Sequence, residues 1–310
     1  MRFAILGAGA LGSAIGGVLT EAGHSVWLIT RNLAHVEAIN QRGLILRTDG
    51  VDRIVKAQAA TNAAAAGVVD CVVVLVKSAQ TRQAMTAAMS LLGPDTTVLS
   101  LQNGLGHEDI LSEIVGRDKV LAGKCYCGGQ IVAPGHVICG TQGKDTHMGE
   151  LDGSMSPRIL RIADAFNKAG LQTTVSDNIM GTIWDKLFIN VATGAISGIT
   201  RLAYGDLYQV PALEACAVAA VAEAMAVAKV RGVRTSITEP VQAWRKAGAG
   251  LPYEFKASIL QTLERGVRTE VDYINGAVVQ LGLQHGVPTP VNATLLACIK
   301  GIEQLLPKTE

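Results

Sequence analysis

One lysine stands out in the segment WDKLFINVATGAISGIT, residues 184–200. Lys186 is followed by fourteen uncharged residues. On a helix, positions three and four apart share a face. This spacing places five polar residues in one stripe: Thr182, Lys186, Asn190, Thr193 and Ser197. An ammonium group offers three hydrogen-bond donors and can give a proton to a developing oxyanion. The stripe therefore either faces water or lines a catalytic site.

A second chemical signal is the glycine pattern GAGALG near the N-terminus. It directly follows the apolar run RFAIL and opens a segment with helical periodicity. In a strand-turn-helix context, G-x-G-x-x-G is typical of a dinucleotide-binding loop, whose glycines allow a tight turn and close approach to a pyrophosphate. A glycine-rich turn in a small-residue sequence is the alternative. The candidate cofactor-binding residues are Gly7, Ala8, Gly9, Ala10, Leu11 and Gly12.

The residue that follows the second expected strand indicates which nucleotide binds. An NAD site usually places an acidic residue there to bind the ribose 2′-hydroxyl. This chain has Thr30, Arg31 and Asn32 instead. A guanidinium suits a 2′-phosphate, so the sequence favours NADP(H) over NAD(H). The alternative is that Arg31 is a solvated residue at the start of a helix.

Polar residues also follow two later apolar runs. VVVLVKSAQ ends in Lys77 and Gln80, and TVLSLQNG ends in Gln102, Asn103 and Gly104. Open α/β sheets bind ligands at the carboxyl ends of their strands, so we expect Lys77, Gln80 and Asn103 to bind the cofactor. Lys77 would otherwise simply mark the end of a buried strand.

The elements that must position these residues divide the chain into two domains. Up to about residue 175, short β-branched runs alternate with segments of helical length, which predicts β-α-β units around a mostly parallel sheet. Strands are expected at FAILG, SVWLIT, CVVVLV, TVLSL and QTTV, with a β-rich region over 119–151. Helices are expected over 10–22, 31–41, 80–92 and 107–115.

After Asp177 the pattern becomes all-helical. The sequence predicts helices over 178–200, 211–232, 238–247, 252–265, 269–285 and 291–305. The predicted fold class is therefore α/β with a Rossmann-type domain, residues 1–176, followed by an all-α domain, residues 177–310. No low-complexity linker separates the two domains, so we expect them to pack directly, with a cleft between them.

The composition of the chain argues against several classes of binding partner. A formal net charge of +1 gives no electrostatic case for nucleic acid or an anionic membrane. The Ala-rich run 215–230 is interrupted by Glu223 and Lys229, and neither a signal peptide nor a membrane span is expected, which favours a cytoplasmic protein. The scattered cysteines, including Cys125 and Cys127, lack the spacing of a metal site, so we expect no metal.

These motifs, in this order, resemble the ketopantoate reductases (2-dehydropantoate 2-reductases) along essentially the whole chain. The resemblance rests on GAGALG, the arginine after the second strand, K77-x-x-Q80, N103-G104, W184-x-K186-L-x-x-N190, Ser258 and E270-V-D-Y-I-N-G276. It implies a Rossmann-type domain followed by a helical domain that is similar to the C-terminal domain of 6-phosphogluconate dehydrogenase. It also implies NADPH-dependent reduction of a 2-oxo acid, here 2-dehydropantoate, to a (2R)-hydroxy acid, (R)-pantoate, in pantothenate biosynthesis.

The resemblance also implies roles for single residues. Lys186 matches the catalytic lysine that protonates the alkoxide, and Glu270 matches the acid that completes the site. Asn190 and Ser258 match substrate-binding residues. Family resemblance and the Ala-rich helix favour a homodimer, although small residues also suit packing within one chain.

Ser258 and Glu270 pose a geometric question. Twelve residues apart, they would lie about a third of a turn from each other's face on an unbroken helix. If both line one pocket, the helix must break between them, and Gly266 is the expected break. Residues 269–272 then resemble a capping signature that puts Glu270 in the first turn of a new helix. An acid that only complements the helix dipole is the alternative.

The chain departs from the family pattern around the substrate. Gly194 stands where the family usually has an asparagine, Tyr204 replaces the asparagine before a glycine, and Thr262 replaces an acid. Losing an amide removes a donor-acceptor pair and is expected to leave space, which favours a bulkier or less hydroxylated substrate. The alternatives are therefore a D-2-hydroxyacid dehydrogenase for branched or aromatic 2-oxo acids, and a non-catalytic NADP-binding sensor.

Overall fold

The computed structural model describes residues 1–307, which form two compact units. The first unit comprises Met1–Gln102 and His107–Ile179, and the second comprises Asn103–Gly106 and Met180–Glu310. The α/β fold class with a helical C-terminal part is confirmed. The expected domain limits, 1–176 and 177–310, stay a prediction.

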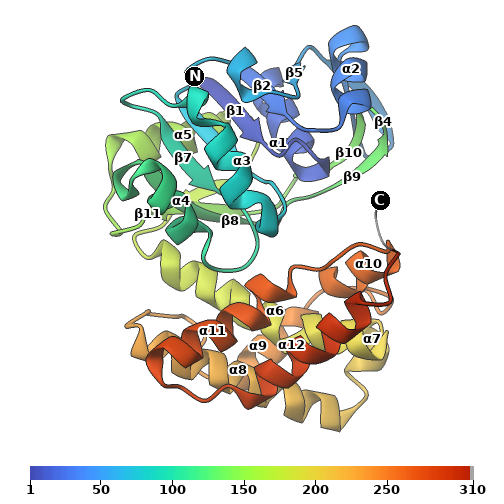
Figure 1. The fold of residues 1–310 in the computed structure, drawn as a ribbon. Coiled ribbons are helices and arrows are strands. Elements are labelled where there is room, and N and C mark those ends of the chain that lie inside the picture. Colours follow the sequence, from blue (N-terminus) through green and yellow to red (C-terminus); the bar gives the residue numbers. More distant parts are fainter. Residues whose placement is uncertain (308–310) are drawn as a thin grey trace. The chain divides into compact units, whose positions relative to one another are not determined.

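An eight-stranded sheet forms the centre of the first unit (Figure 1). Its strands, in spatial order, are β12 (Thr173–Val175), β11 (Thr146–Glu150), β8 (Val120–Cys125), β7 (Thr97–Ser100), β6 (Cys71–Val74), β1 (Arg2–Leu6), β2 (Ser25–Ile29) and β5 (Gln58–Ala60). Neighbouring strands are parallel except β8 and β11, which are antiparallel. The central strands are buried on both faces, which explains their unbroken apolar runs.

Helices cover both faces of this sheet (Figure 1). They are α1 (Ala10–Glu21), α2 (Leu33–Arg42), α3 (Thr81–Ala87), α4 (His107–Val115) and α5 (Pro157–Lys168). One core packs α1 and α5 against the sheet through residues such as Ile15, Phe166 and Phe3. The other core packs α3 and α4 against the opposite face through Met85 and Leu111. The polar strand ends therefore lie at an edge between two helical layers.

A smaller sheet packs beside helix α1. Its strands, in spatial order, are β4 (Val51–Val55), β3 (Leu44–Thr48), β10 (His136–Gly140) and β9 (Gly128–Ala133). The expected β-rich region 119–151 thus divides between the two sheets. Strands β3, β4 and β5 and helix α5 were not predicted. Strand β4 lacks a continuous apolar run, because Asp52 and Arg53 interrupt it.

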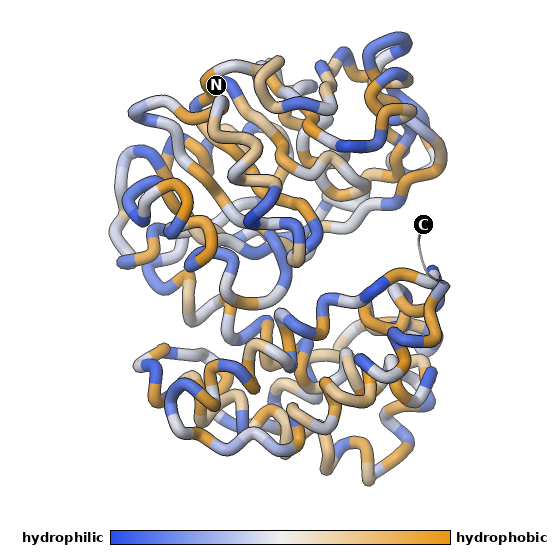
Figure 2. Tube along the Cα trace, in the orientation of Figure 1, coloured by the Kyte–Doolittle hydropathy of each residue, from blue (hydrophilic) through white to orange (hydrophobic). Residues whose placement is uncertain are grey.

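The second unit is helical, as the sequence predicted (Figure 1). Its helices are α6 (Ile179–Thr200), α7 (Tyr204–Leu207), α8 (Pro211–Val230), α9 (Pro240–Gly248), α10 (Ser258–Glu264), the 3₁₀ turn η5 (Val271–Tyr273), α11 (Asn275–His285) and α12 (Pro290–Glu303). Prolines open α8, α9 and α12, where an N–H would have no helical partner. Hydrophobic colouring runs along much of these helices in Figure 2.

Two predicted helices of this unit were too long. The expected helix 252–265 begins only at Ser258, because the preceding backbone accepts hydrogen bonds from α7: Tyr204 N donates to Phe255 O, and Gly205 N donates to Tyr253 O. The expected helix 269–285 is divided at Ile274, whose φ of −110° and ψ of −91° are not helical. Tertiary contacts decide both boundaries.

Candidate active site

The glycine loop has the geometry that a pyrophosphate requires. Gly7 has φ +105°, and a Cβ there would lie 2.4 Å from Val76 N. A Cβ on Gly12 would lie 2.4 Å from Gly7 O, so the third glycine permits close packing of helix and strand. Gly9, the N-cap of α1, has no heavy atom within 4 Å of its Cβ position. The protein leaves that side of the loop open, where a phosphate can approach the first N–H groups of α1.

The remaining loop residues support this arrangement. Ala8 is buried, and Ala10 and Leu11 form the half-buried first turn of α1. The loop is held to the neighbouring strand because Gly7 N and Ala8 N both donate to Ile29 O, at 3.0 and 2.9 Å. The residues present therefore fit a dinucleotide.

Strand β9 adds a contact to this loop that sequence reasoning missed. A Cβ on Gly129 would lie 2.8 Å from Ala10 O and 3.2 Å from Leu11 N. The backbone of β9 thus lies against the first turn of α1, where only glycine fits. The adjacent pair Gly128 and Gly129 was the available signal, since glycine within a strand often marks a close backbone approach.

Arg31 lies beside the loop, after strand β2. Its side chain is exposed, and among residues 1–307 the structure shows no hydrogen bond or ion pair for its guanidinium. The neighbouring Asn32 has a structural role, because its side chain accepts a hydrogen bond from His35 N and caps α2. Arg31 is the cation at this strand end, and its exposed guanidinium is available to a phosphate.

The two later strand ends differ in their roles. Lys77 is exposed at the N-cap of the 3₁₀ turn Ser78–Gln80, and Gln80 is half-buried. Gln102 is buried, and its Nε2 donates to Val76 O and Thr81 Oγ1, at 2.9 and 2.8 Å. Gln102 therefore links the end of strand β7 to the segment that follows strand β6. Lys77 and Gln80 stay predicted cofactor ligands.

In the second unit, Lys186 meets Asn103. The Nζ atom of Lys186 donates to Asn103 Oδ1 at 2.7 Å. The four residues Asn103–Gly106 belong to this unit although they follow strand β7 of the first. The structure thus joins two predicted site residues that are 83 positions apart in the chain. An amide oxygen orients the ammonium without neutralising its charge.

The polar stripe on α6 divides into two parts. Lys186 and Asn190 are half-buried, whereas Thr193 and Ser197 are buried within the fold. The Oγ1 of Thr193 lies 2.9 Å from the Tyr204 hydroxyl, and Ser197 Oγ donates to Leu202 O at 2.8 Å. The expectation that the whole stripe faces one environment was wrong, because its C-terminal part bonds to the turn that follows α6.

The predicted break between Ser258 and Glu270 is confirmed. Helix α10 starts at Ser258, which is exposed, and Gly266 follows its end with φ +70°. Glu270 lies at the N-cap of η5, not in the first turn of an α-helix as expected. Thr269 does bond to the turn that follows it: its Oγ1 accepts a hydrogen bond from Val271 N at 3.2 Å, although that turn is η5 and not an α-helix. The hydroxyl and N–H of Thr269 also both donate to Glu303.

The carboxylate of Glu270 influences a neighbouring phenol. Burial raises the pKa of Tyr273 above its ordinary value, and the negative charges of Asp272 and Glu270 raise it further. Tyr273 therefore stays a neutral hydroxyl at physiological pH. The segment that carries Glu270 is an acidic environment, which favours a nearby ammonium in its charged form.

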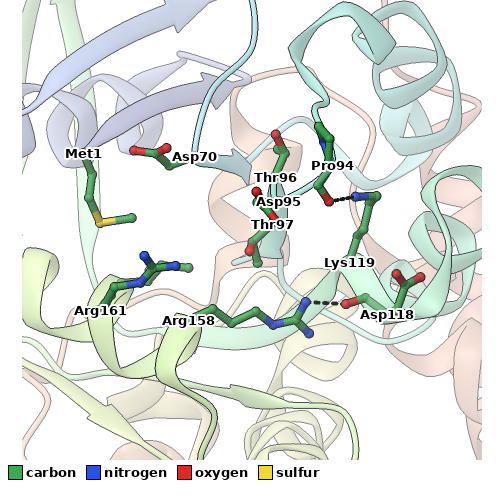
Figure 3. A pocket seen from close by; sticks show the side chains of 11 residues that line it. Met1, Asp70, Pro94, Asp95, Thr96, Thr97, Asp118, Lys119, Arg158 and Arg161 are labelled. Carbon is green, nitrogen blue, oxygen red and sulfur yellow. Dashed lines mark hydrogen bonds between the residues drawn. The ribbon is translucent and has the colours of Figure 1, made fainter.

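A separate cavity lies where the sheet strands begin, at the edge opposite the glycine loop (Figure 3). Its volume is about 430 Å³, and Asp70, Thr97 and Arg158 help to line it. Two of its cations have partners: Lys119 Nζ donates to Gly93 O and Pro94 O, and Arg158 binds Glu150. None of the predicted site residues lines this cavity.

Other features of the described residues narrow the chemistry. Within residues 1–307, no group of three or more histidine, cysteine or acidic side chains is arranged to hold a metal ion. All six cysteines are free, and Cys125 and Cys139 are buried residues of β8 and β10. In that same part of the chain, no helix has both the length and the apolar character that crossing a membrane needs.

Comparison with known proteins agrees with this geometry. Residues 3–153 match the family model of ketopantoate reductase PanE/ApbA, and residues 178–303 match its C-terminal model. The chain is 33% identical to the 2-dehydropantoate 2-reductase of Halobacterium salinarum, over 97% of this chain and 98% of that protein. The chain belongs to the ketopantoate reductase family.

Solved structures of ketopantoate reductase family proteins share the whole fold. A family member from Ralstonia eutropha superposes with a TM-score of 0.90 at 35% identity, covering 99% of both chains. A D-mandelate dehydrogenase, in a ternary structure with NADH and anilino(oxo)acetate, gives a TM-score of 0.91 at 27% identity and covers 99% of both chains. The chain is thus a dinucleotide-dependent oxidoreductase of this family.

The departures from the ketopantoate reductase pattern have structural explanations. A Cβ on Gly194 would lie 3.2 Å from Ile259 Cδ1, so the missing amide leaves no space there, contrary to expectation. Tyr204 is buried. Its ring centroid lies 5.1 Å from that of Phe255, and its hydroxyl is hydrogen-bonded to Thr193 Oγ1. Thr262 Oγ1 donates to Ser258 O. Apolar or internally bonded groups thus replace three polar side chains of the family.

Proposed function

We propose that this protein uses NADPH to reduce a 2-oxo acid to a (2R)-hydroxy acid, and that the acid is 2-dehydropantoate, giving (R)-pantoate in pantothenate biosynthesis. The observation that carries the proposal is the hydrogen bond from Lys186 Nζ to Asn103 Oδ1. It holds a proton donor at a fixed place on the α6 face that also carries Asn190.

The chain's own residues account for the proton balance. When bound, the reduced nicotinamide supplies the hydride equivalent that the ketone carbon accepts. Lys186 donates a proton from Nζ to the carbonyl oxygen as negative charge develops on it, so the product is a neutral alcohol. General acid catalysis of this kind contributes about 10²–10⁴-fold to rate. Lys186 then regains a proton from solvent.

The other proposed residues bind or orient. Asn103 holds the ammonium through its amide oxygen. Asn190 and Ser258 bind the substrate, and Glu270 completes the site. Cofactor binding is assigned to residues 7–12 with Arg31, Lys77, Gln80 and Asn103. A homodimer and a cytoplasmic location stay predictions.

A second candidate function is the reduction of branched or aromatic 2-oxo acids. The contact of Ile259 with the Gly194 position favours it, because an apolar side chain stands where the family has an amide. A substrate with a hydroxyl group, such as 2-dehydropantoate, loses a hydrogen-bond partner at such a position, whereas an apolar one does not. The similarity to a D-mandelate dehydrogenase bound to NADH supports the same alternative.

A panel of substrates distinguishes the two. Initial rates of NADPH and NADH oxidation are measured with 2-dehydropantoate, 2-oxoisovalerate and phenylglyoxylate at equal concentrations. The leading proposal expects the highest kcat/KM for 2-dehydropantoate with NADPH. Turnover of phenylglyoxylate alone would establish the second candidate. Nucleotide binding without turnover of any of the acids would favour the non-catalytic sensor.

A further inference from the structure

Helix α12 holds the segment that carries Glu270 from both sides. The N–H and hydroxyl of Thr269 donate to Glu303 Oε1, at 2.8 and 2.7 Å. On the other side of Glu270, Asp272 Oδ2 lies 2.9 Å from Lys300 Nζ. Lys300 also lies 3.1 Å from Glu303 Oε2. We call these four residues, Thr269, Asp272, Lys300 and Glu303, the α12 clamp.

The α12 clamp is charged at neutral pH. Burial alone raises the pKa of Glu303, but the hydrogen bonds from Thr269 and the ammonium of Lys300 outweigh it, so the pKa lies below its ordinary value. The hydrogen bond to Asp272 raises the pKa of Lys300. The Glu303 side chain is only 2% exposed. A carboxylate buried to this degree is costly unless it is paired and hydrogen-bonded, so removing either partner should disturb the segment.

Residues 269–273, the segment around Glu270, also contact the loop 103–106, which binds the proposed proton donor Lys186. Leu105 N donates to Tyr273 O at 3.0 Å. A Cβ on Gly104 would lie 2.5 Å from the same oxygen, and Gly104 has φ +93°, so only glycine lets the loop approach this closely. The residue before it, Asn103, accepts the hydrogen bond from Lys186. Residues 269–273 therefore connect the α12 clamp to the Lys186–Asn103 pair.

We propose that Lys300 and Glu303 are positioning residues for the reaction: they fix residues 269–273, and through this segment both Glu270 and the loop that orients Lys186. The inference rests on the proposed function, because it takes Glu270 and Lys186 as site residues. Neither Lys300 nor Glu303 touches a reacting atom in this scheme. Their effect is on geometry, where a displacement of about 1 Å can cost up to about 100-fold in rate.

Three substitutions test the α12 clamp in the full-length protein. Lys300→Met removes the ion pairs with Asp272 and Glu303. Glu303→Leu removes the hydrogen bonds from Thr269 and the ion pair with Lys300, and Glu303→Gln keeps an acceptor for Thr269 but loses the charge. We expect kcat to fall about tenfold for Lys300→Met and Glu303→Leu, as for a partial misplacement of catalytic groups. The KM for NADPH should change less than kcat, because Asn103 is the one proposed cofactor ligand in the loop that this segment positions. Lys300→Arg, which keeps the cation, should restore most of kcat.

A matched control separates positioning from general stability. Lys168→Met removes an exposed ion pair on α5, where Lys168 Nζ lies 2.7 Å from Asp164 Oδ2, and it should leave kcat unchanged. The pH profile of kcat is the second measurement. The apparent pKa of the limb that reports the proton donor should shift in Lys300→Met but not in Lys168→Met. A lower melting temperature with unchanged kcat and pH profile would show a purely structural clamp and overturn the inference. If Glu303→Leu does not fold, the results for Glu303→Gln and Lys300→Met decide whether the α12 clamp positions the site.

Hydrogen exchange tests the connection without turnover. The amide of Leu105 should exchange faster in Lys300→Met than in wild type, because its acceptor Tyr273 O is less firmly held. Unchanged exchange would overturn the coupling between the clamp and the loop. Failure of the proposed function has a different signature, namely a wild-type protein that reduces no 2-oxo acid in the panel, and the exchange result stands in either case.

Discussion

The nucleotide loop and the proposed proton-donor site are built in different ways. The loop is a contiguous stretch in which strand β1, the turn and helix α1 follow one another, and Gly12 packs against Gly7 of the same stretch. The proton-donor site combines Lys186 of α6, Asn103 from another part of the chain and the segment around Glu270. The first kind of site is a property of local sequence, whereas the second exists only in the folded unit.

This difference predicts how each site responds to substitution. A change in the loop acts on the few atoms around the altered residue, so its effect is limited to nucleotide binding and to the packing of α1. A change in the assembled site is transmitted through hydrogen bonds between distant segments, as through Tyr273 and Leu105. Such effects are expected to be non-additive, because the residues act as one unit.

The largest expected effect is that of Lys186→Ala. Loss of the proton donor should lower kcat for the best 2-oxo acid by about 10²–10⁴-fold. The dissociation constant for NADPH, measured by fluorescence titration, should be nearly unchanged. Lys186→Arg is the matched control: it keeps a cation but cannot release a proton at neutral pH, so it should recover little of the rate. An undiminished rate in Lys186→Ala would refute the mechanism and remove the contrast between the two sites.

A pair of glycine substitutions tests the loop. Gly12→Ala places a Cβ 2.4 Å from Gly7 O, so it should lower both the melting temperature and NADPH affinity. Gly9→Ala meets no protein atom within 4 Å, so the fold should be unaffected. Its methyl group instead occupies the space of the pyrophosphate, and NADPH affinity should fall by roughly 10–100-fold, the range of about 1–3 kcal/mol for overpacking. If Gly9→Ala binds NADPH like wild type, the phosphate does not approach at this residue.

The sequence predicted most of the loop and much less of the assembled site. The loop was accessible because its spacing, the preceding strand and the following helix are all local. Helices α4 and α12 were also placed nearly residue by residue, since each has a clear apolar period and a defined start. Strand β9 falls within the predicted β-rich region, but its contact with the first turn of α1 was not predicted, because it joins Gly129 to Ala10, more than a hundred positions away.

The assembled site shows why the remaining contacts could not be predicted from the sequence. Family resemblance named Lys186 and Glu270, but helical periodicity assigned Thr193 and Ser197 to the same face as Lys186. The structure bonds both to the turn after α6, a contact that periodicity does not contain. Likewise, Thr269 had the spacing of a helix cap, and its oxygen accepts from Val271 N, but a buried glutamate from α12 also takes both of its donors. Tertiary partners, not propensities, decide the role of such polar residues.

The smallest expected effect is that of Arg31→Ala, and it tests whether nucleotide choice is as local as the loop itself. Arg31 is exposed, so its hydrogen bonds to a 2′-phosphate are partly screened, and NADPH affinity should fall about tenfold. NADH lacks that phosphate, so its affinity should change by less than about twofold. The ratio of the two dissociation constants is the measurement, with Arg161→Ala on α5 as the control for loss of an exposed arginine. Equal losses for both nucleotides would mean that Arg31 supports the loop and not the 2′-phosphate, and the origin of any NADPH preference would then lie outside this strand end.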